Sequence, residues 1–225
     1  MTGKHRIAGI ITAAGSSARM KGVKKELALI DGKPVLKIVA DVFAESSVFD
    51  QVVITYPPSS TGILNADLSY RSILDGIDLD VLWVAGGNSR QESVYNALLA
   101  LSECSVDYVL IHDAARPWVT ESLIKAVLRE TKKYGACIPV VPHVNASKEI
   151  DGAGKIVNHH NRSSVVGAQT PQGFSYPDIL SAHQEAKKTG NDYPDDAEAY
   201  HRAIGPVHTV PGDPANRKIT FRYDL

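Results

Sequence analysis

Residues 7–21 read Ile7-Ala8-Gly9-Ile10-Ile11-Thr12-Ala13-Ala14-Gly15-Ser16-Ser17-Ala18-Arg19-Met20-Lys21, an apolar strand that leads directly into a loop of small residues carrying one arginine. Small side chains allow backbone N–H groups to approach phosphate oxygens closely, and a helix that begins beyond the loop would direct its positive end at them. The guanidinium of Arg19 can bridge two such oxygens. The stretch therefore predicts a triphosphate site, with an ordinary strand-to-helix turn as the alternative.

Short apolar runs alternate with segments of helical periodicity along the chain. The runs are Ile7–Thr12, Val52–Tyr56, Val81–Val84, Tyr108–His112 and Cys137–Val141, and the helical segments include Leu36–Phe43, Gln91–Leu101 and Leu123–Tyr134. Nearly continuous apolar strands of about five residues indicate a sheet that is covered on both faces. We therefore expect one α/β domain over residues 1–225, built on a doubly wound, mainly parallel, Rossmann-like sheet.

Two local patterns border the predicted sheet. Ser89 lies three residues before Glu92, which matches a capping box and predicts a helix start after the loop Ala85-Gly86-Gly87-Asn88. Asn216-Arg217-Lys218-Ile219-Thr220 is a polar run that predicts a surface strand with a charged edge.

The segment from Asn145 to about Val166 loses the periodicity of the preceding units. It predicts an arm at about residues 143–166 that forms an interface. Its paired histidines, His159-His160, are adjacent, so their side chains would point apart on an extended arm. We therefore expect no zinc site there.

The composition is typical of a globular enzyme or binding protein without a strong overall charge. The chain has 24 Lys and Arg residues against 25 Asp and Glu residues, so nothing attracts nucleic acid or an anionic membrane to the whole molecule, and phosphate binding has to be local. The two cysteines, Cys104 and Cys137, indicate a reducing compartment rather than a disulfide framework. The residues after Met1 form neither a secretory signal nor a membrane span, and we expect a cytoplasmic protein.

Polar residues follow several of the predicted strands, at the edge where an open parallel sheet collects its ligands. Lys25 lies beyond the first strand, Gly86-Gly87-Asn88 follows the third, and Asp113 ends the fourth. Lys25 can neutralise a transferring phosphoryl group, although a pair with Lys24 is also typical of a solvated surface. Asp113 either caps a helix or holds a Mg²⁺–triphosphate or a ribose hydroxyl. We interpret His112 as a packed side chain rather than a catalytic base.

Together these motifs resemble the 2-C-methyl-D-erythritol 4-phosphate cytidylyltransferase family, including its relatives that act on ribitol 5-phosphate, over nearly the whole chain. The matching residues are Ala13-Ala14-Gly15 with Arg19-Met20 and Lys25, Asp31-Gly32-Lys33-Pro34-Val35-Leu36, Gly86-Gly87 with Arg90 and Ser93-Val94, His112-Asp113-Ala114-Ala115-Arg116-Pro117, Arg162, Gln169-Thr170-Pro171-Gln172, Asp195-Asp196-Ala197, Lys218-Ile219-Thr220 and Asp224-Leu225. The strings around Asp113 and Thr170, in this order, are specific signals.

The resemblance implies the nucleotide-diphospho-sugar transferase type of fold with a protruding dimerisation arm. It implies an enzyme that transfers CMP from CTP to 2-C-methyl-D-erythritol 4-phosphate, giving 4-diphosphocytidyl-2-C-methyl-D-erythritol and pyrophosphate in non-mevalonate isoprenoid precursor biosynthesis. Mg²⁺ would be the cofactor, and CTP and a sugar-alcohol phosphate the ligands. A homodimer joined through the arm is implied, with no nucleic-acid or membrane partner.

The same resemblance implies roles for individual residues. Catalysis would fall to three cations, Arg19, Lys25 and Lys218. The nucleotide would be bound by Ala13, Ala14, Gly15, Gly86, Gly87, Asn88, Ser93 and Asp113, with Asp113 also facing a Mg²⁺ carried by the phosphates. The acceptor would be bound by Arg116, Ser147 and Arg162, with Arg162 reaching from the arm of a partner subunit.

The chain departs from the family pattern at three places. Asn145-Ala146-Ser147-Lys148 stands where the family usually has Asp-Thr-x-Lys, so the threonine hydroxyl near the acceptor is missing and Ser147 is its nearest substitute. Lys24-Lys25-Glu26 stands where the usual string is Pro-Lys-Gln, and Asn88 replaces an aspartate. These changes affect the predicted acceptor-binding site more than the predicted nucleotide-binding site.

Three alternative functions are open at this point. The nearest keeps the chemistry and takes ribitol 5-phosphate or another polyol phosphate as acceptor. A nucleotide-binding protein that has lost catalysis is motivated by the missing threonine, although the cations of the pattern are retained. An NAD-dependent oxidoreductase is disfavoured, because the first loop lacks G-x-G-x-x-G and Thr55-Tyr56-Pro57 ends the second strand in place of an acidic residue.

Overall fold

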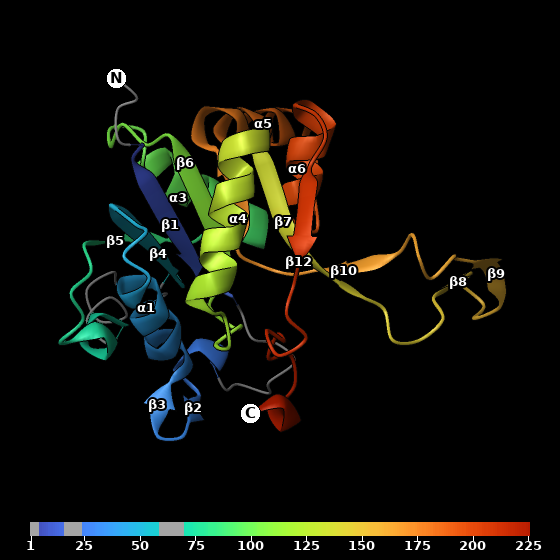
Figure 1. The fold of residues 1–225 in the computed structure, drawn as a ribbon, viewed down its shortest axis with the longest axis horizontal. Coiled ribbons are helices and arrows are strands. Elements are labelled where there is room, and N and C mark those ends of the chain that lie inside the picture. The colour runs from blue at the N-terminus through green and yellow to red at the C-terminus, as the bar shows by residue number, and fades with distance from the viewer. Residues whose placement is uncertain (1–4, 16–23, 59–69) are drawn as a thin grey trace.

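The computed structural model describes residues 5–15, 24–58 and 70–225, and its centre is an eight-stranded sheet with helices on both faces (Figure 1). The strand order is β10-β7-β11-β6-β1-β4-β5, with β12 paired to β7. These strands are β1 (Ile7–Thr12), β4 (Gln51–Tyr56), β5 (Val81–Ala85), β6 (Tyr108–Asp113), β7 (Ala136–Pro142), β10 (Val166–Ala168), β11 (Gln172–Ser175) and β12 (His208–Pro211). The expected doubly wound α/β class is confirmed.

In the described part of the chain five helices cover the sheet, and the first three of them match the predicted periodic segments to within two residues at each end. They are α1 (Val35–Glu45), α3 (Arg90–Ala100), α4 (Glu121–Tyr134), α5 (Tyr176–Thr189) and α6 (Asp196–Ala203). Shorter elements are η2 (Lys25–Leu27), β2 (Leu29–Ile30), β3 (Lys33–Pro34), η3 (Ser72–Leu74) and η4 (Arg222–Asp224). Within the described ranges, no helix is long and apolar enough to cross a membrane.

Two hydrophobic cores lie on opposite faces of the sheet, and β1 contributes to both. Ile7 and Ile11 belong to the core beneath α1 and α4, whereas Ala8 and Ile10 belong to the core beneath α3 and α5. Successive strand residues point to opposite faces, so a strand buried on both faces is apolar at every position. This is why β1 could be predicted from its sequence with its bounds correct.

Two strands run against the others. β11 is inserted between β6 and β7 and pairs antiparallel with both, and β10 pairs antiparallel with β7. Gly173 of β11 has no space for a side chain, because a Cβ atom there would overlap the hydroxyl of Thr131 on α4. The sheet is mainly parallel, as predicted. The strands β10, β11 and β12 were not predicted, because their runs of three or four residues are too short for a periodic signal.

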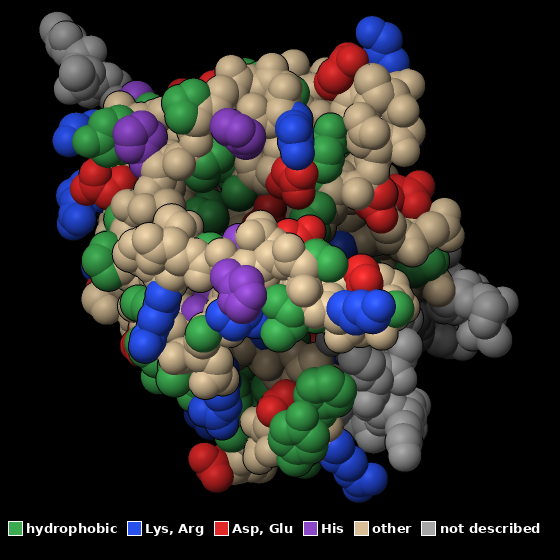
Figure 2. Space-filling model, turned by 90° about the vertical axis from the view of Figure 1, so that its right-hand side faces the viewer, with side chains coloured by type: hydrophobic (Ala, Val, Ile, Leu, Met, Phe, Trp, Pro, Cys, Tyr) green, Lys and Arg blue, Asp and Glu red, His purple; other side chains and the backbone are tan. Residues whose placement is uncertain are grey.

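The segment after β7 leaves the sheet as an arm, which projects to the right in Figure 1. Within it, β8 (Lys148–Ile150) and β9 (Ile156–His159) form a two-stranded antiparallel hairpin. Val144, Ile150 and Val157 on the arm are 82%, 63% and 57% exposed. Viewed from the arm side, the surface shows hydrophobic side chains among Lys, Arg and His side chains (Figure 2). An arm at about 143–166 was predicted from the sequence, and the hairpin lies inside that range.

The run Asn216–Thr220 does not form the predicted surface strand. It is irregular chain anchored by two fully buried side chains, Asn216 and Ile219. Ile219 packs with Ala28 and Val35, and its N–H donates to the Ala115 carbonyl at 2.8 Å. The strand prediction was wrong because these contacts with distant residues replace a strand ladder.

Candidate active site

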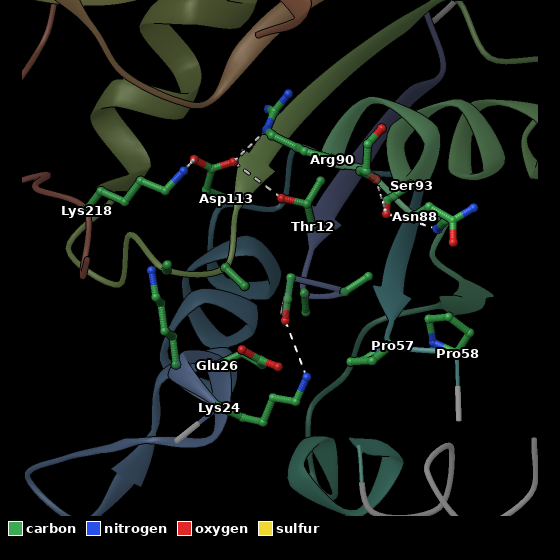
Figure 3. Close-up of a pocket in the computed structure, with 18 residues that line it drawn as sticks. Thr12, Lys24, Glu26, Pro57, Pro58, Asn88, Arg90, Ser93, Asp113 and Lys218 are labelled. Carbon is green, nitrogen blue, oxygen red and sulfur yellow. Dashed lines mark hydrogen bonds and ion pairs between the residues drawn. The ribbon is translucent and has the colours of Figure 1, made fainter. Parts of the chain in front are cut away.

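A cavity of about 600 Å³ opens at the edge of the sheet where β1, β4 and β6 end (Figure 3). This is the edge at which ligands collect in open parallel sheets. The lining residues are Thr12, Ala13, Ala14, Gly15, Lys24, Lys25, Glu26, Pro57, Pro58, Gly87, Asn88, Ser89, Arg90, Ser93, Asp113, Ala114, Ala115 and Lys218. They come from six separate stretches of sequence, so the cavity exists only in the folded chain.

The loop after β1 forms one wall of the cavity. Its first residue, Ala13, donates its N–H to both the carbonyl and the hydroxyl oxygen of Thr55, each at 3.2 Å. A Cβ atom at Gly15 would meet nothing within 4 Å, so this position faces open space. The loop is therefore tied to the sheet at Ala13 and open toward the cavity at Gly15.

The glycine loop before α3 forms a second wall. The hydroxyl of Ser93 accepts a hydrogen bond from the Gly87 N–H at 3.0 Å and donates one to the Ser89 carbonyl at 2.8 Å. A Cβ atom at Gly87 would overlap the side chain of Glu92, and one at Gly86 would overlap Ala14. Gly86 therefore allows the loops after β1 and β5 to approach one another, and Gly87 leaves room for the side chain of Glu92.

The predicted cap of α3 is confirmed in part. The hydroxyl of Ser89 accepts from the Glu92 N–H at 3.1 Å, as a capping residue should. The Glu92 carboxylate accepts from the N–H of Asn88 at 2.6 Å, one residue before the position expected for a capping box. Since the N–H groups of Ala13, Gly87 and Asn88 all have acceptors within the protein, these residues would bind a ligand through other atoms.

Asp113, at the end of β6, is the centre of the charged network in the cavity. Lys218 donates to its Oδ2 atom at 2.6 Å, and Arg90 donates to its Oδ1 atom at 3.2 Å. The Thr12 hydroxyl donates to the same Oδ1 atom at 3.3 Å. The buried Nε atom of Arg116 lies 3.9 Å from Oδ2. One carboxylate therefore organises three cations from different parts of the chain.

The charges around Asp113 determine its protonation state. Burial alone would raise the pKa of its carboxyl group, but the charges of Arg90 and Lys218 outweigh burial and hold this pKa well below the usual range. Arg90 also donates to Asp196 at 2.8 Å, and Asp196 is buried beside the Nε2 atom of His183 at 3.2 Å. Although burial opposes the charge of Arg90, these two carboxylates raise the pKa of its guanidinium. The carboxylates of Asp113 and Asp196 and the guanidinium of Arg90 are therefore charged at neutral pH.

His112 has a structural role, as interpreted from the sequence. Its Nε2 atom lies 3.1 Å from the Arg116 carbonyl oxygen, which can only accept, so Nε2 carries the proton. Its Nδ1 atom then accepts from the Thr170 hydroxyl at 2.9 Å, and Thr170 accepts from the Asp113 N–H at 3.2 Å. Burial lowers the pKa of His112 to about 4. A neutral imidazole with both nitrogens engaged holds the backbone of Asp113 in place.

A short helical turn supplies the third wall. Lys25 and Glu26 of η2 are both buried, and the Tyr70 hydroxyl donates to the Glu26 carboxylate at 2.6 Å. Burial and this carboxylate raise the pKa of Tyr70 well above its usual range. The ammonium of Lys24 reaches the Gly15 carbonyl oxygen at 3.4 Å. The turn therefore faces the loop after β1 across the cavity (Figure 3).

Lys218 is held at the cavity by its neighbours in the chain. The Asn216 amide donates to the Thr170 carbonyl at 2.8 Å, and the Asn216 carbonyl accepts from Arg116 at 2.9 Å. The Arg217 guanidinium lies over the ring of Trp118, 3.8 Å from its centre. These anchors and buried Ile219 fix the backbone on both sides of Lys218.

Most of the residues predicted for the site lie together in the cavity. Those that line it are Ala13, Ala14, Gly15, Lys25, Gly87, Asn88, Ser93, Asp113 and Lys218. Gly86 packs against Ala14 at the base of the wall. Arg19 lies outside the described residues.

The predicted acceptor residues lie outside the lining of the cavity. The Arg116 guanidinium donates hydrogen bonds to the carbonyl oxygens of Asn216 and Ala168. Ser147 and Arg162 lie on the arm, and the Arg162 guanidinium donates to the His143 carbonyl at 3.2 Å. Their assignment to the acceptor stays a prediction.

Several residues that line the cavity had no role predicted from the sequence. The most important is Arg90, which bridges the buried carboxylates of Asp113 and Asp196. Its position directly after the capping residue Ser89 was an available signal. Thr12, Pro57 and Lys24, the first lysine of the Lys24-Lys25 pair, also line the cavity, and no motif gave them a role in it.

A sequence profile described as 2-C-methyl-D-erythritol 4-phosphate cytidylyltransferase matches residues 7–225. A relative with the same description from Bacillus mycoides is 35% identical over 217 residues, which cover 96% of this chain and 93% of the relative. A bifunctional enzyme IspD/IspF from Chelativorans sp. is 35% identical over 225 residues, which cover 98% of this chain. The chain spans about half (54%) of that bifunctional relative.

Solved structures of the same kind share the fold. A 4-diphosphocytidyl-2C-methyl-D-erythritol synthase from Anaerococcus prevotii has a TM-score of 0.86 at 26% identity, with 98% of this chain and 92% of that chain covered. A 2-C-methyl-D-erythritol 4-phosphate cytidylyltransferase from Thermus thermophilus has a TM-score of 0.76 at 28% identity, with 97% and 95% covered. Both matches therefore cover nearly all of this chain.

Proposed function

The chain belongs to the 2-C-methyl-D-erythritol 4-phosphate cytidylyltransferase family, and from this membership we propose that it transfers CMP from CTP to 2-C-methyl-D-erythritol 4-phosphate. The products are 4-diphosphocytidyl-2-C-methyl-D-erythritol and pyrophosphate. The observation that supports this most directly is the cavity in which Asp113, Lys218 and Arg90 meet beside the loop Ala13–Gly15. Its position and charge suit a nucleoside triphosphate.

The proposed chemistry is an in-line displacement at the α-phosphorus of CTP. An oxygen of the acceptor phosphate forms the new P–O bond while the bond to pyrophosphate breaks, and pyrophosphate leaves with the electron pair. Negative charge grows around this phosphorus, and cations already held there lower the barrier. Lys25, Lys218 and Arg19 are the proposed cations. The acceptor phosphate is ionised at neutral pH, so the step needs no general base, and neutral His112 is not one.

We propose that Mg²⁺ enters this site with the triphosphate. No cluster of three or more His, Cys, Asp or Glu side chains suited to a metal occurs among residues 5–15, 24–58 and 70–225. Asp113 in the cavity nevertheless fits the usual protein contribution, since Mg²⁺ is often held by one or two carboxylates with substrate phosphates and waters. When bound, the ion would neutralise phosphate charge, and Asp113 would hold it with a carboxylate that also accepts from Lys218 and Arg90.

We further propose that the arm joins two subunits and that the acceptor phosphate is bound by Arg116, Ser147 and Arg162. The exposed apolar side chains of the arm support this, because a monomer rarely leaves a protruding apolar surface uncovered. Arg162 and Ser147 would then bind acceptor in the cavity of the partner subunit.

The proposal is tested by pyrophosphate release from the purified protein with Mg²⁺. Each of CTP, UTP, ATP and GTP is combined with 2-C-methyl-D-erythritol 4-phosphate, ribitol 5-phosphate and other polyol phosphates. Release with CTP and 2-C-methyl-D-erythritol 4-phosphate is expected to be fastest. Faster release with ribitol 5-phosphate would reassign the acceptor, and no release from any pair would indicate a nucleotide-binding protein without catalysis.

A further inference from the structure

The cavity lining carries more positive than negative charge in the part of the chain that the structure describes. Four cationic side chains face two carboxylates there, namely Lys24, Lys25, Arg90 and Lys218 against Glu26 and Asp113. A concave site with excess positive charge concentrates anions. A cation can turn toward a bound anion at low cost only if its movement leaves no carboxylate without a counter-charge.

Lys218 and Arg90 already have counter-charges within the protein. Lys218 lies 2.6 Å from Asp113, and Arg90 bridges Asp113 and the buried Asp196. Breaking either contact would uncover a buried carboxylate, which is costly. These two cations are held firmly in the structure as it stands.

Lys24 differs from Lys218 and Arg90 because its hydrogen bond is to an uncharged group. Its ammonium lies 3.4 Å from the carbonyl oxygen of Gly15, a long contact to an uncharged acceptor. An ammonium has three N–H donors, and a hydrogen bond to an ionised phosphate is about twice as strong as one to a neutral group. Figure 3 shows Lys24 extending across the cavity toward the loop after β1, on a different side from Lys218. Moving from Gly15 to an anion would leave no carboxylate without its partner.

We propose that Lys24 is a further triphosphate-binding residue of this chain. It contacts phosphate oxygens from the side of the loop Ala13–Gly15, while Lys218 acts from the side of Asp113. This inference rests on the proposed function and adds a residue to it. Lys24 precedes the buried Lys25 in η2, so the same turn supplies two cations to the cavity.

The experiment measures binding rather than turnover. Isothermal titration calorimetry with CTP and Mg²⁺, in the absence of acceptor, compares the wild type with Lys24→Met, Lys24→Gln and Lys24→Arg. Lys33→Met is the matched control, because Lys33 is an exposed lysine on β3 outside the cavity lining. Removal of one charge-assisted hydrogen bond should raise the Kd for CTP about 10-fold to 100-fold. Lys24→Arg should restore most of the affinity, and Lys33→Met should leave it unchanged.

The ligand series separates phosphate contact from other effects. The loss in the Met and Gln variants should grow from CMP to CTP, and it should shrink at high salt because added ions screen the charge. If the wild type binds CTP and both variants bind it equally well, the role of Lys24 is overturned while the proposed function stands. If the wild type does not bind CTP, the proposed function and the role of Lys24 both fail. Unchanged melting temperatures in the variants would show that any loss of affinity is local.

Discussion

The ammonium of Lys218 lies 2.6 Å from the Oδ2 atom of Asp113, although 105 residues separate the two in sequence. The same carboxylate accepts from Arg90 at 3.2 Å, so its charge holds together the end of β6, the start of α3 and the last segment of the chain. Asp113 is thus the counter-ion that positions the cations of the cavity.

Asp113→Asn should therefore affect both stability and activity. The amide leaves Lys218, Arg90 and Arg116 without their shared counter-charge, and removing one partner of a buried pair typically costs about 3–5 kcal/mol. Urea denaturation should show this loss of unfolding free energy, and pyrophosphate release should fall. Asp41→Asn removes a surface ion pair with Lys37 and is the control, with an expected cost below about 1 kcal/mol. Equal stabilities for the two variants would contradict the central role of Asp113.

The titration of Asp196 should make the free energy of unfolding depend on pH in acid solution. Burial would raise the pKa of Asp196, but Arg90 and His183 lower it to about 2 in the folded protein. The unfolded value is about 4, so unfolding takes up a proton between these limits. The contribution of Asp196 is complete above about pH 4 and is lost as the pH falls toward about 2. Asp196→Asn should be less stable at pH 6 and should show a shallower loss from pH 4 to pH 2. An unchanged slope would show that Asp196 does not titrate in this way.

Lys25→Ala should reduce turnover by about 10²-fold to 10³-fold, the usual effect of removing one group that stabilises developing charge. The fold should survive, which circular dichroism can check. Lys33→Ala supplies the control, since Lys33 is an exposed lysine outside the cavity lining. Wild-type turnover in Lys25→Ala would remove Lys25 from the proposed catalytic cations.

Arg116 and Arg162 should differ in their kinetic signatures. Replacing either with alanine should raise KM for the acceptor more than KM for CTP. Arg116 also bonds the Asn216 carbonyl beside Lys218, so Arg116→Ala should lower kcat as well. Arg162 lies on the arm, and Arg162→Ala should leave kcat nearly unchanged. A larger change in KM for CTP would move the residue in question to the nucleotide side.

The arm should control the oligomeric state. Ile150→Asp combined with Val157→Asp places charges on two side chains that are 63% and 57% exposed, and it should convert a dimer into a monomer in sedimentation equilibrium. Ile204→Asp, at a residue 42% exposed outside the arm, should leave the dimer intact. A monomeric wild type would disprove the proposed dimer.

The sequence predicted the elements whose signal is local. β1 has no polar side chain from Ile7 to Ile11 because both of its faces are buried, and the start of α3 was evident from Ser89 and the glycines before it. β11 could not be predicted, because its four residues are defined by pairing with β6 and β7. The prediction of a surface strand at Asn216–Thr220 was wrong for the same reason, since contacts with residues distant in sequence bury Asn216 and Ile219.

The residues of the candidate site could likewise be predicted where their signal is local and not where it depends on distant contacts. Gly15, Asp113 and Lys218 could be placed in it from strand ends and family motifs, and they line the cavity. The double bridge of Arg90 to Asp113 and Asp196 could not be predicted, because it depends on side-chain positions on three different elements. The assignment of Ser147 and Arg162 to the acceptor stays a prediction, because both residues lie on the arm and outside the lining of the cavity.

The long sequence separation within the charged network also bears on the order of folding. Arg90 and Asp196 are 106 residues apart, and contacts of such separation close large loops, which makes them slow to form. A chain emerging from the ribosome completes β1, β4, β5 and β6 long before it supplies Asp196 or Lys218. The charged network around Asp113 therefore cannot be complete before Lys218 is synthesised, so a nucleotide bound to this network can stabilise the finished protein but cannot guide the folding of the first strands.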